Sequence, residues 1–353
     1  MQDEDDMSLP QSMQALVLRC EGLAETTSGL AVADLGALVA LARIAVPTPG
    51  PGQVLVRVAL ASVNPSDLHF LKGEYGQPRR RGTPAGFEGT GTVVAAADGQ
   101  AAALVGRRVS FLASASGSWA EFALTDAAAC VEVDAGVSDD DAAALLVNPL
   151  TAVAMIALVA AAGARAVVLT AAGSQLGRML IDLARERGIA PVAVVRSAGN
   201  VAALRAQGAA AVLVSDEPDF AARIDTVLRA ERPRVLLDAV GDQIAADIFL
   251  AMPAHSRWIS YGMLSATGPC LAQMGQFVFS NKRIEGFWLS RWLHAVAGPA
   301  RAAAAEEVQR HFLNGDWHTQ VGARIRLDDA LRDLPDALQR PGKVMLVPGA
   351  DAA

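Results

Sequence analysis

The stretch AVVLTAAGSQLGRMLIDLARERG, residues 166–188, decides the fold of this chain. It opens with an apolar, strand-like run, Ala166–Thr170, and small residues follow this run directly. A helix-like run begins immediately after them and continues to Arg187. A strand that turns tightly into a helix presents backbone N–H groups and the positive end of a helix dipole, where a pyrophosphate can bind. We therefore predict that this turn binds a dinucleotide through Gly173, Ser174, Gln175, Leu176 and Gly177.

The glycine pattern of the turn is incomplete. The dinucleotide fingerprint GxGxxG has three glycines, and this chain keeps only Gly173 and Gly177. A purely structural connection between a strand and a helix is the alternative interpretation. The position of the turn within a series of alternating strands and helices favours the cofactor site.

The chain divides into two parts with different patterns. Strand-like and helix-like runs alternate after about residue 139, which is typical of a parallel sheet with helices on both faces. The strand-like runs of this part are residues 166–170, 191–195, 211–214, 235–239 and 258–261, and its helix-like runs include 176–187 and 200–207. The earlier part has short strand-like runs separated by turns, at residues 14–19, 29–32, 53–62, 89–95, 107–111 and 119–124.

The end of the chain has a helix-like run, 300–313, and an apolar strand, 343–347, which we expect to rejoin the first part. A chain of 353 residues is long enough for two hydrophobic cores. We therefore predict an α/β fold with two domains and a disordered, acidic leader. The predicted ranges are 1–13 for the leader, 14–138 and 296–353 for the β-rich domain, and 139–295 for a Rossmann-type, doubly wound domain.

Charge and cysteine content exclude several classes of protein. The net charge is −7 and no long basic run is present, which argues against nucleic-acid binding as the main function. The one compact basic cluster, Arg79–Arg81, is typical of a solvated loop, although it could also meet the phosphates of a carrier such as coenzyme A. Cys20, Cys130 and Cys270 are far apart in the sequence, odd in number and never spaced as CxxC, which argues against a disulfide framework or a zinc cluster, so we expect a cytoplasmic protein.

We expect no membrane segment and no export. The N-terminus is acidic, whereas a secretory signal begins with basic residues. Residues 142–164 are apolar, but Asn148 and Pro149 interrupt them and a strand-like run follows, so a buried helix is the better interpretation.

Arg196 indicates which dinucleotide binds. It follows the strand at residues 191–195, where an NAD-binding domain would present an acidic residue to the ribose hydroxyls. A guanidinium can instead pair with the 2′-phosphate of NADPH, so we predict NADPH as the cofactor, with Arg196 and Ser197 in contact with it. The alternative is a surface arginine at the end of a strand, and Arg205 is a second, weaker candidate.

Five motifs resemble one known family. They are VNPSDLHFLKGEYG (63–76), GFEGTG (86–91), GSWAEFA (117–123), LLVNPLTA (145–152) and GFWLSRW (286–292). In this order they resemble the zinc-independent branch of the medium-chain dehydrogenase/reductases, most closely the 2-enoyl thioester reductases, with the NADPH:quinone oxidoreductases as near relatives. The resemblance covers nearly the whole chain from about residue 14. It implies a GroES-like catalytic domain beside the Rossmann domain, and a homodimer.

The same comparison predicts that no metal takes part. The zinc alcohol dehydrogenases of this superfamily bind metal through a cysteine near the NPSD position and a histidine in a GHE motif. This chain has Asn64 and Phe87 there, and neither offers the sulfur or nitrogen donor that zinc needs. His69 is better interpreted as a packed or hydrogen-bonded residue than as a ligand. Without a metal, we expect reduction of an activated alkene or a quinone rather than oxidation of an alcohol.

The resemblance assigns Tyr75 as the catalytic residue. A phenol, whose ordinary pKa is about 10, is protonated at neutral pH and can donate a proton or hold a developing enolate. A tyrosine that merely lines the pocket is the alternative. The resemblance also implies substrate contacts for Asn64 and Trp288. It implies cofactor contacts for Asn148, Tyr261, Gly262, Met263, Phe287, Trp288 and Lys343.

The resulting hypothesis is NADPH-dependent reduction of a 2-enoyl thioester or a similar activated alkene such as an enone. The alternatives are an NADPH:quinone oxidoreductase and a non-catalytic NADPH-binding protein. Two departures from the family pattern leave the acyl length and the carrier open. They are the loop GQPRRRGTPAG after Tyr75 and the sequence YGML, residues 261–264, in place of YGGM.

Overall fold

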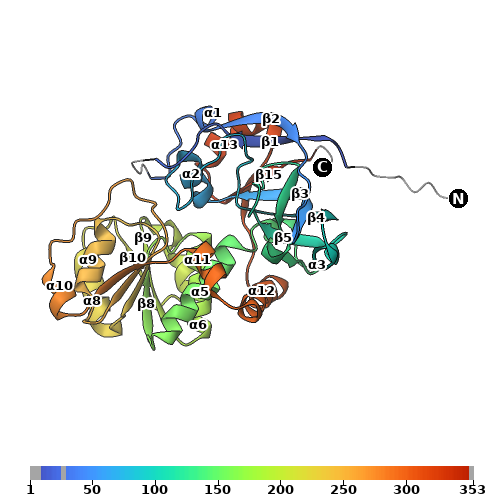
Figure 1. Ribbon diagram of the computed structural model, residues 1–353. Helices are drawn as coiled ribbons and strands as arrows, with labels where there is room; N and C mark the ends of the chain where they lie inside the picture. Colours follow the sequence, from blue (N-terminus) through green and yellow to red (C-terminus); the bar gives the residue numbers. More distant parts are fainter. Residues whose placement is uncertain (1–8, 25–28, 350–353) are drawn as a thin grey trace. The chain divides into compact units, whose positions relative to one another are not determined.

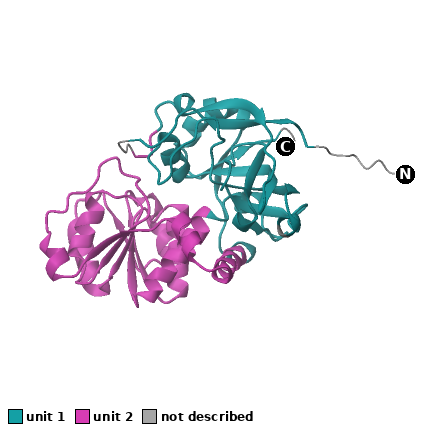
Figure 2. Ribbon diagram, viewed as in Figure 1, with its two compact units in different colours: residues 1–26, 32–146, 311–353 teal, residues 27–31, 147–310 magenta. Residues whose placement is uncertain are grey.

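The computed structural model describes residues 9–24 and 29–349, which form two compact units (Figures 1 and 2). Unit 1 contains the described residues up to 24 together with 32–146 and 311–349, and unit 2 contains 29–31 and 147–310. Each unit has its own sheet.

Unit 2 is a doubly wound domain around a six-stranded sheet in which every pair of neighbouring strands is parallel. The strand order is β10-β9-β8-β11-β12-β13. Figure 1 shows α5 and α6 on one face of the sheet, and α8 and α9 on the other. The strands are β8 (Ala166–Leu169), β9 (Ala190–Val195), β10 (Ala211–Val214), β11 (Val235–Asp238), β12 (Arg257–Ser260) and β13 (Arg283–Gly286). The helices are α5 (Val147–Ala161), α6 (Gln175–Glu186), α7 (Val201–Ala206), α8 (Phe220–Glu231), α9 (Gln243–Ala251), α10 (Gly275–Phe279), α11 (Leu289–Ala295) and α12 (Gly298–Leu313).

The predicted alternation of strands and helices in this unit is confirmed. Its central strands are apolar because helices cover both faces, and all four residues of β8 and of β11 are buried. Large side chains complete the core beside α9, where Phe249 and Trp258 pack with their ring centroids 5.6 Å apart.

Unit 1 is built on a mostly antiparallel sheet with the order β14-β15-β3-β4-β5-β7, and β6 also pairs with β3. A separate two-stranded sheet joins β1 to β2. The strands are β1 (Ser12–Leu18), β2 (Val39–Ala45), β3 (Gln53–Val63), β4 (Glu88–Ala96), β5 (Arg108–Leu112), β6 (Phe122–Asp126), β7 (Cys130–Glu132), β14 (Val321–Arg326) and β15 (Lys343–Val347). The helices are α1 (Leu35–Leu38), α2 (Pro65–Lys72), α3 (Gly99–Ala102), α4 (Asp139–Ala143) and α13 (Ala330–Ala337). The last strand rejoins the first part of the chain as predicted, because β15 pairs with β3.

Two expectations for the first part of the chain differ from the structure. Residues 29–32 form a turn and a loop rather than a strand, and β1 pairs with β2, whose residues 39–45 we did not predict as a strand. The first ordered strand begins at Ser12 and buries Met13 almost completely, so it starts inside the predicted leader. Residues 1–8 of that leader lie outside the described residues.

The division between the units lies later in the chain than the predicted limits of 138/139 and 295/296. Helix α4 belongs to unit 1 because the Ser110 hydroxyl donates to the Ala142 carbonyl at 2.6 Å and Arg108 pairs with Asp139 at 2.6 Å. Most of α12 belongs to unit 2, where its Glu307 pairs with Arg187 at 2.7 Å. Both shifts result from side-chain contacts over long sequence distances, which a pattern of runs does not contain.

The apolar run 142–164 forms the end of α4 and all of α5. Pro149 is the third residue of α5 and lies in its first turn, where no backbone N–H is needed for a helical hydrogen bond. Within the described part of the chain, no helix is both long and apolar enough to span a membrane.

Candidate active site

The turn after β8 is packed too closely for side chains. Ser174 is the N-cap of α6, and its hydroxyl accepts a hydrogen bond from the Gly177 N–H at 3.0 Å. A Cβ on Gly177 would lie 2.6 Å from the Ala172 carbonyl oxygen, so any larger residue would push the helix away from the strand. The close packing leaves the backbone N–H groups of this helix start accessible to a phosphate.

An asparagine joins this turn to the loop after β9. A Cβ on Gly173 would lie 2.6 Å from Asn200 Nδ2, and Arg178 donates to Asn200 Oδ1 at 2.9 Å and to the Gly173 carbonyl at 3.3 Å. Arg196 lies in the same loop, exposed, directly after β9. The structure thus brings the predicted pyrophosphate turn and the predicted 2′-phosphate residue together at the carboxyl ends of β8 and β9. We did not predict the roles of Arg178 and Asn200, because their contact joins residues that are 22 positions apart in the sequence.

The remaining predicted cofactor residues of unit 2 follow its other strands. Tyr261 to Met263 come directly after β12, and a Cβ on Gly262 would lie 2.6 Å from the Ala239 carbonyl oxygen. The Tyr261 hydroxyl is buried without a hydrogen-bond partner among the described residues, and burial raises the pKa of this phenol. Such an unsatisfied group fits a site that a ligand completes.

Three further predicted residues lie at the starts of α11 and α5, and these two helices pack against each other: Phe287, Trp288 and Asn148. The Phe287 N–H donates to the Ser260 carbonyl at 2.8 Å, and Trp288 is the N-cap residue of α11. Asn148 lies in the first turn of α5, which packs against both α6 and α11.

Asp238, the last residue of β11, connects the segments at the carboxyl end of this sheet, and we did not predict this role. Its buried carboxylate accepts hydrogen bonds from the Thr170 hydroxyl at 2.6 Å, the Trp258 indole at 3.0 Å and the backbone N–H groups of Val240 and Gly241 at 3.0 Å. Burial raises the pKa of Asp238, and these donors oppose that shift. The carboxylate therefore ties the ends of β8, β11 and β12 together beside the Tyr261 loop.

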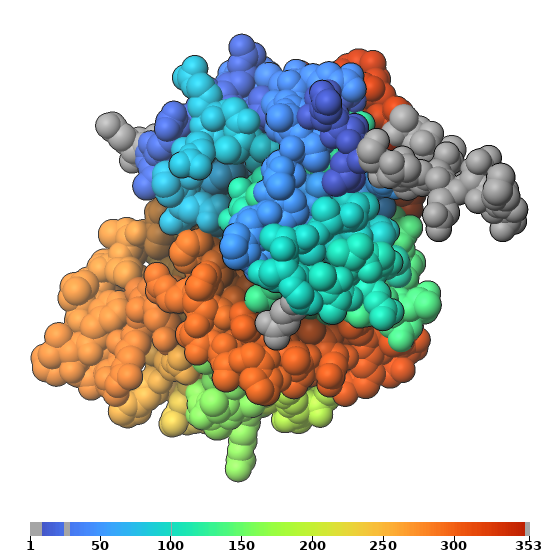
Figure 3. All heavy atoms as spheres, turned by 45° about the vertical axis from the view of Figure 1, so that its right-hand side comes forward, coloured from blue at the N-terminus to red at the C-terminus, as the bar shows by residue number. Residues whose placement is uncertain are grey.

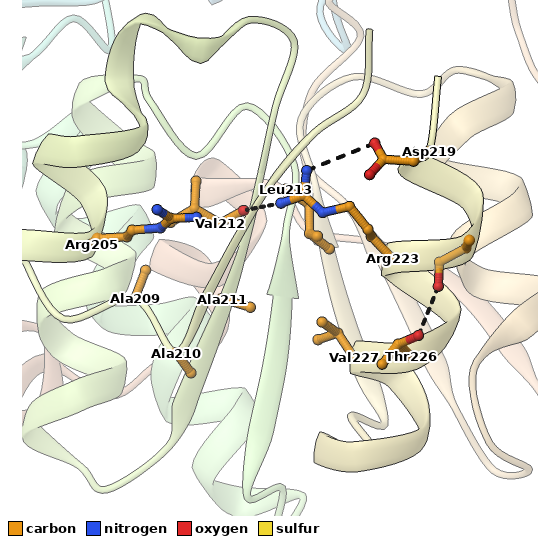
Figure 4. Close-up of a pocket in the computed structure, with 11 residues that line it drawn as sticks. Arg205, Ala209, Ala210, Ala211, Val212, Leu213, Asp219, Arg223, Thr226 and Val227 are labelled. Carbon is orange, nitrogen blue, oxygen red and sulfur yellow. Dashed lines mark hydrogen bonds and ion pairs between the residues drawn. The ribbon is translucent and has the colours of Figure 1, made fainter. Parts of the chain in front are cut away.

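A cavity of about 520 Å³ in unit 2 lies away from these residues (Figure 4). Alanines 209–211, at the amino end of β10, line it together with Arg205 at the end of α7 and residues of α8. Arg196 follows the carboxyl end of β9, and α7 leads from the carboxyl ends of the strands back to their amino ends. Arg205 therefore lies at the other end of α7 from the loop that contains Arg196.

Unit 1 contains a buried polar network around Glu88. Its Oε1 atom accepts from the Ser62 hydroxyl at 2.8 Å and the Asn64 amide at 2.9 Å, and its Oε2 atom accepts from the Leu146 N–H at 3.2 Å. The Asn64 amide oxygen accepts from Lys343 Nζ at 2.5 Å. Lys343, which we predicted as a cofactor contact, thus lies in unit 1 beside Asn64.

Asp67 is the second buried carboxyl group of this network. It completes a capping box at the start of α2, because its Oδ2 atom accepts from the Asn64 N–H at 2.7 Å. Its Oδ1 atom is buried without a hydrogen-bond partner among the described residues. Burial raises the pKa of Asp67 from 3.8 to about 7, and burial also lowers the pKa of Lys343.

Tyr75 lies in a turn that several contacts hold in place. Helix α2 ends at Gly73, which is left-handed with φ 81°, and Arg79 donates to the Leu71 carbonyl at 3.0 Å. The Tyr75 ring packs against Phe87 with a centroid distance of 5.0 Å. Arg79 is therefore a structural residue, whereas its neighbours Arg80 and Arg81 are exposed as expected of a solvated loop.

His69 is also a structural residue, as we expected from the sequence. It is buried, and its Nδ1 atom lies 3.0 Å from Glu74 Oε2. Lys72 pairs with the same carboxylate at 2.9 Å. The end of α2 is therefore fixed directly before Tyr75.

Comparisons with known proteins agree with this arrangement. Residues 50–135 match the model of the alcohol dehydrogenase GroES-like domain, and residues 176–305 match that of the zinc-binding dehydrogenases. A solved candidate NADPH:quinone reductase from Mesorhizobium loti is 46% identical, with a TM-score of 0.92 over 97% of this chain and 100% of that chain. The mitochondrial enoyl-[acyl-carrier-protein] reductase of Caenorhabditis elegans is 28% identical over 300 residues, which are 83% of this chain and 85% of that protein. A mycobacterial protein solved in complex with NADPH shares the fold, with 24% identity and a TM-score of 0.76 over 95% of this chain and 100% of that chain.

The raised pKa of Asp67 predicts a pH dependence of stability. The native carboxyl keeps its proton up to about pH 7, whereas the unfolded one loses it near pH 3.8, so this group lowers stability progressively between these pH values. Asp67→Asn cannot titrate and keeps an oxygen acceptor for the Asn64 N–H. Relative to the wild type, its free energy of unfolding should therefore rise between pH 5 and pH 8, by on the order of 2 kcal/mol.

Thermal melting at both pH values measures this difference. Asp216→Asn, at an exposed aspartate of unit 2, is the matched control and should follow the wild type at both pH values. A difference between Asp67→Asn and wild type that is the same at pH 5 and pH 8 would show that Asp67 titrates normally.

Proposed function

Because the chain belongs to the medium-chain dehydrogenase/reductase family, among the enoyl thioester and NADPH:quinone reductases, we propose that it is an NADPH-dependent reductase of an activated C=C bond. Its proposed substrate is a 2-enoyl thioester. The observation that carries this proposal is the fixed position of Tyr75 against Phe87, at a ring distance of 5.0 Å. The phenol is the proton donor, and it packs on the residue that stands where zinc-dependent relatives have a histidine ligand.

The residues of unit 2 fit NADPH. Gly173 and Gly177 leave no room for a Cβ in the turn, which is the form that a pyrophosphate site on a helix start requires. The exposed guanidinium of Arg196 pairs with the 2′-phosphate. The bound cofactor supplies the hydride, and the protein provides its orientation and the electrostatic environment.

The chemistry assigned to Tyr75 follows from the electron flow. Hydride addition to the β-carbon of an enoyl thioester leaves negative charge on the α-carbon and the thioester oxygen. The Tyr75 O–H then donates its proton to the α-carbon, and solvent restores that proton. An interaction that strengthens as this charge develops stabilises the transition state more than the bound substrate.

The residues at the former metal positions do not fit zinc. The Asn64 amide nitrogen donates to Ser62 and Glu88, and its oxygen accepts from Lys343, so this side chain already uses its polar atoms. The Phe87 ring packs between Phe70 and Tyr75, 5.0 Å from each. We therefore propose hydride transfer without a metal.

Quinone reduction is the second candidate function, favoured by the 46% identity to the Mesorhizobium loti protein. A quinone needs only a hydride and protons, and water can supply the protons. A non-catalytic NADPH-binding protein would reduce neither substrate. We further propose the reducing cytoplasm as the location, because all three cysteines are free thiols.

We also propose that the protein is a homodimer that pairs through β13. This strand is at an edge of the unit 2 sheet, and all four of its residues are exposed. Helix α10, in the orange part of Figure 3, adds Val278 and Phe279, which are 72% and 88% exposed. An exposed sheet edge with apolar neighbours is a typical interaction surface.

The sequence of β13 is complementary to itself. In an antiparallel pair of two copies centred on Ile284, Arg283 faces the partner's Glu285, and the two-fold axis repeats this pair. Residues opposite each other in such a pair lie on the same face of the sheet, so the two charges can meet. A second copy of this chain is therefore the partner that the edge fits.

Arg196→Ala should raise the Michaelis constant for NADPH about 10- to 100-fold, because a lost charge-assisted pair costs about 1.5–3 kcal/mol. The constant for NADH should hardly change. Steady-state kinetics with both cofactors measure the effect. Arg205→Ala, near the amino end of β10, is the matched control and should leave both Michaelis constants unchanged. A wild type that uses NADH as well as NADPH would refute the assignment.

Tyr75→Phe should lower the turnover of crotonyl-CoA by about 10²-fold or more, because the ring remains and only the proton donor is lost. The dissociation constant of NADPH should stay near that of the wild type. Reduction of a simple quinone should be affected much less. A variant that reduces crotonyl-CoA at nearly the wild-type rate, or a wild type that reduces quinones alone, would favour the quinone oxidoreductase.

Arg283→Glu should convert the dimer to a monomer, because it places like charges opposite each other twice in the two-fold pair. The double variant Arg283→Glu, Glu285→Arg restores opposite charges and should restore the dimer in part, since Glu285 also pairs with Arg257 within the chain. Light scattering after gel filtration measures the mass. A monomeric wild type, or a dimer that survives Arg283→Glu, would exclude this interface.

A further inference from the structure

Lys343 is a cation whose position the fold determines. It begins β15, and the next residue, Val344, pairs with Val63 of β3, so the lysine lies beside Asn64. Its Nζ atom donates to the Asn64 amide oxygen at 2.5 Å. This is the one hydrogen bond that the ammonium group makes to the residues described. Because an ammonium has three N–H donors, two remain for another group.

Asn64 gives this ammonium a rigidly held acceptor. Its amide nitrogen donates to the Ser62 hydroxyl at 3.1 Å and to Glu88 Oε1 at 2.9 Å, which directs the amide oxygen to Lys343. Its backbone N–H is held by the Asp67 carboxyl. A donor that is fixed before the substrate binds loses little free energy to reorganisation during the reaction, which makes it effective in a transition state.

Two buried carboxyl groups, Glu88 and Asp67, influence this ammonium electrostatically, and both are hydrogen-bonded to Asn64. Burial lowers the pKa of Lys343, and the negative charges of Glu88 and Asp67 oppose that shift. The oxygens of Glu88 accept from Ser62, Asn64 and the Leu146 N–H, all of which are neutral donors. The two carboxyl groups therefore act against the effect of burial, while the remaining donors of Lys343 stay available.

We propose that Lys343 is a catalytic residue that binds the carbonyl oxygen of the substrate and stabilises the negative charge that forms there. This inference rests on the proposed reduction of an activated C=C bond. When the hydride bonds to the β-carbon, the π electron pair shifts toward the carbonyl and its oxygen becomes an enolate oxygen, to which Lys343 donates. Proton transfer from Tyr75 to the α-carbon then re-forms the carbonyl, and solvent returns a proton to Tyr75.

The network connects this cation to the proton donor within unit 1. Asp67 accepts from the Asn64 N–H, the Phe87 backbone lowers the pKa of Asp67, and the Phe87 ring packs against Tyr75. Lys343 thus supplies beside Asn64 a positive charge of the kind that a metal supplies in the zinc-dependent relatives. The role differs from the cofactor contact predicted from the sequence, and the two roles have different kinetic consequences.

Lys343→Met tests the proposal because it keeps the aliphatic length and removes the charge and the donors. With crotonyl-CoA at saturating NADPH, turnover should fall about 10²- to 10³-fold, as for the loss of one fixed donor to an oxyanion. The dissociation constant of NADPH, measured by fluorescence titration, should change less than threefold. In Lys343→Ala, added ethylammonium should restore part of the turnover, which a purely structural lysine would not show.

Lys282→Met is the matched control for removing a buried lysine. Lys282 donates to the carbonyls of Phe249 and Leu250 at 2.9 and 2.7 Å, so this variant should melt at a lower temperature but keep its turnover. If Lys343→Met does not fold, Lys343→Gln, which can still donate to Asn64, takes its place in every measurement.

Two results would overturn the proposal. A tenfold or larger rise in the dissociation constant of NADPH, with turnover retained at saturation, would make Lys343 a cofactor contact. Unchanged turnover in both Lys343→Met and Lys343→Gln would make it structural. A wild type that reduces quinones alone would refute the enoyl reductase function only. Lys343 would then be tested on quinone turnover, where hydride addition also charges an oxygen.

Discussion

The carboxylate of Glu88 is removed from water, and the arrangement of unit 1 depends on the donors that it requires. A buried carboxylate without hydrogen bonds would be very costly, so donors must be held around it. They come from Ser62 and Asn64 at the end of β3 and from Leu146, the residue directly before α5. Segments that are distant in sequence are thereby held together at the start of α2, and the position of Lys343 follows from theirs.

Unit 2 also has a buried carboxylate that collects hydrogen-bond donors, at the carboxyl end of its sheet. Asp238 is buried at the end of β11 and takes donors from β8, β12 and the loop that follows it. The loops that the proposed cofactor would touch are thus attached to one acceptor. In both units a buried carboxylate organises the backbone, while the residues assigned to binding or catalysis lie on the segments that it holds.

The sequence predicted the parts of the fold that depend on local pattern. The apolar runs of unit 2 and the last strand could be located because strands buried on both faces are continuously apolar. The turn that contains Gly173 and Gly177 could be located because a strand-like run passes directly into a helix-like one, and the structure adds that Gly177 packs closely against Ala172. The partner of β1 was missed because β2, residues 39–45, alternates only weakly between buried and exposed residues. The unit boundaries were missed because they depend on contacts such as that between Arg187 and Glu307.

The roles of Glu88 and Lys343 in the polar network of unit 1 could not be predicted from the sequence, for a physical reason. A carboxylate that anchors a fold and one that acts on a substrate are the same residue type, and only the identity of their donors separates them. Glu88 accepts from neutral groups on three segments, so it serves the fold. Lys343 is attached through one bond to a rigid amide, so most of its capacity to donate is not used by the fold. Asn64 stands where the zinc-dependent relatives have a metal ligand. Its amide oxygen is a poor ligand for zinc but a good acceptor for an ammonium, so this position binds Lys343 instead of a metal.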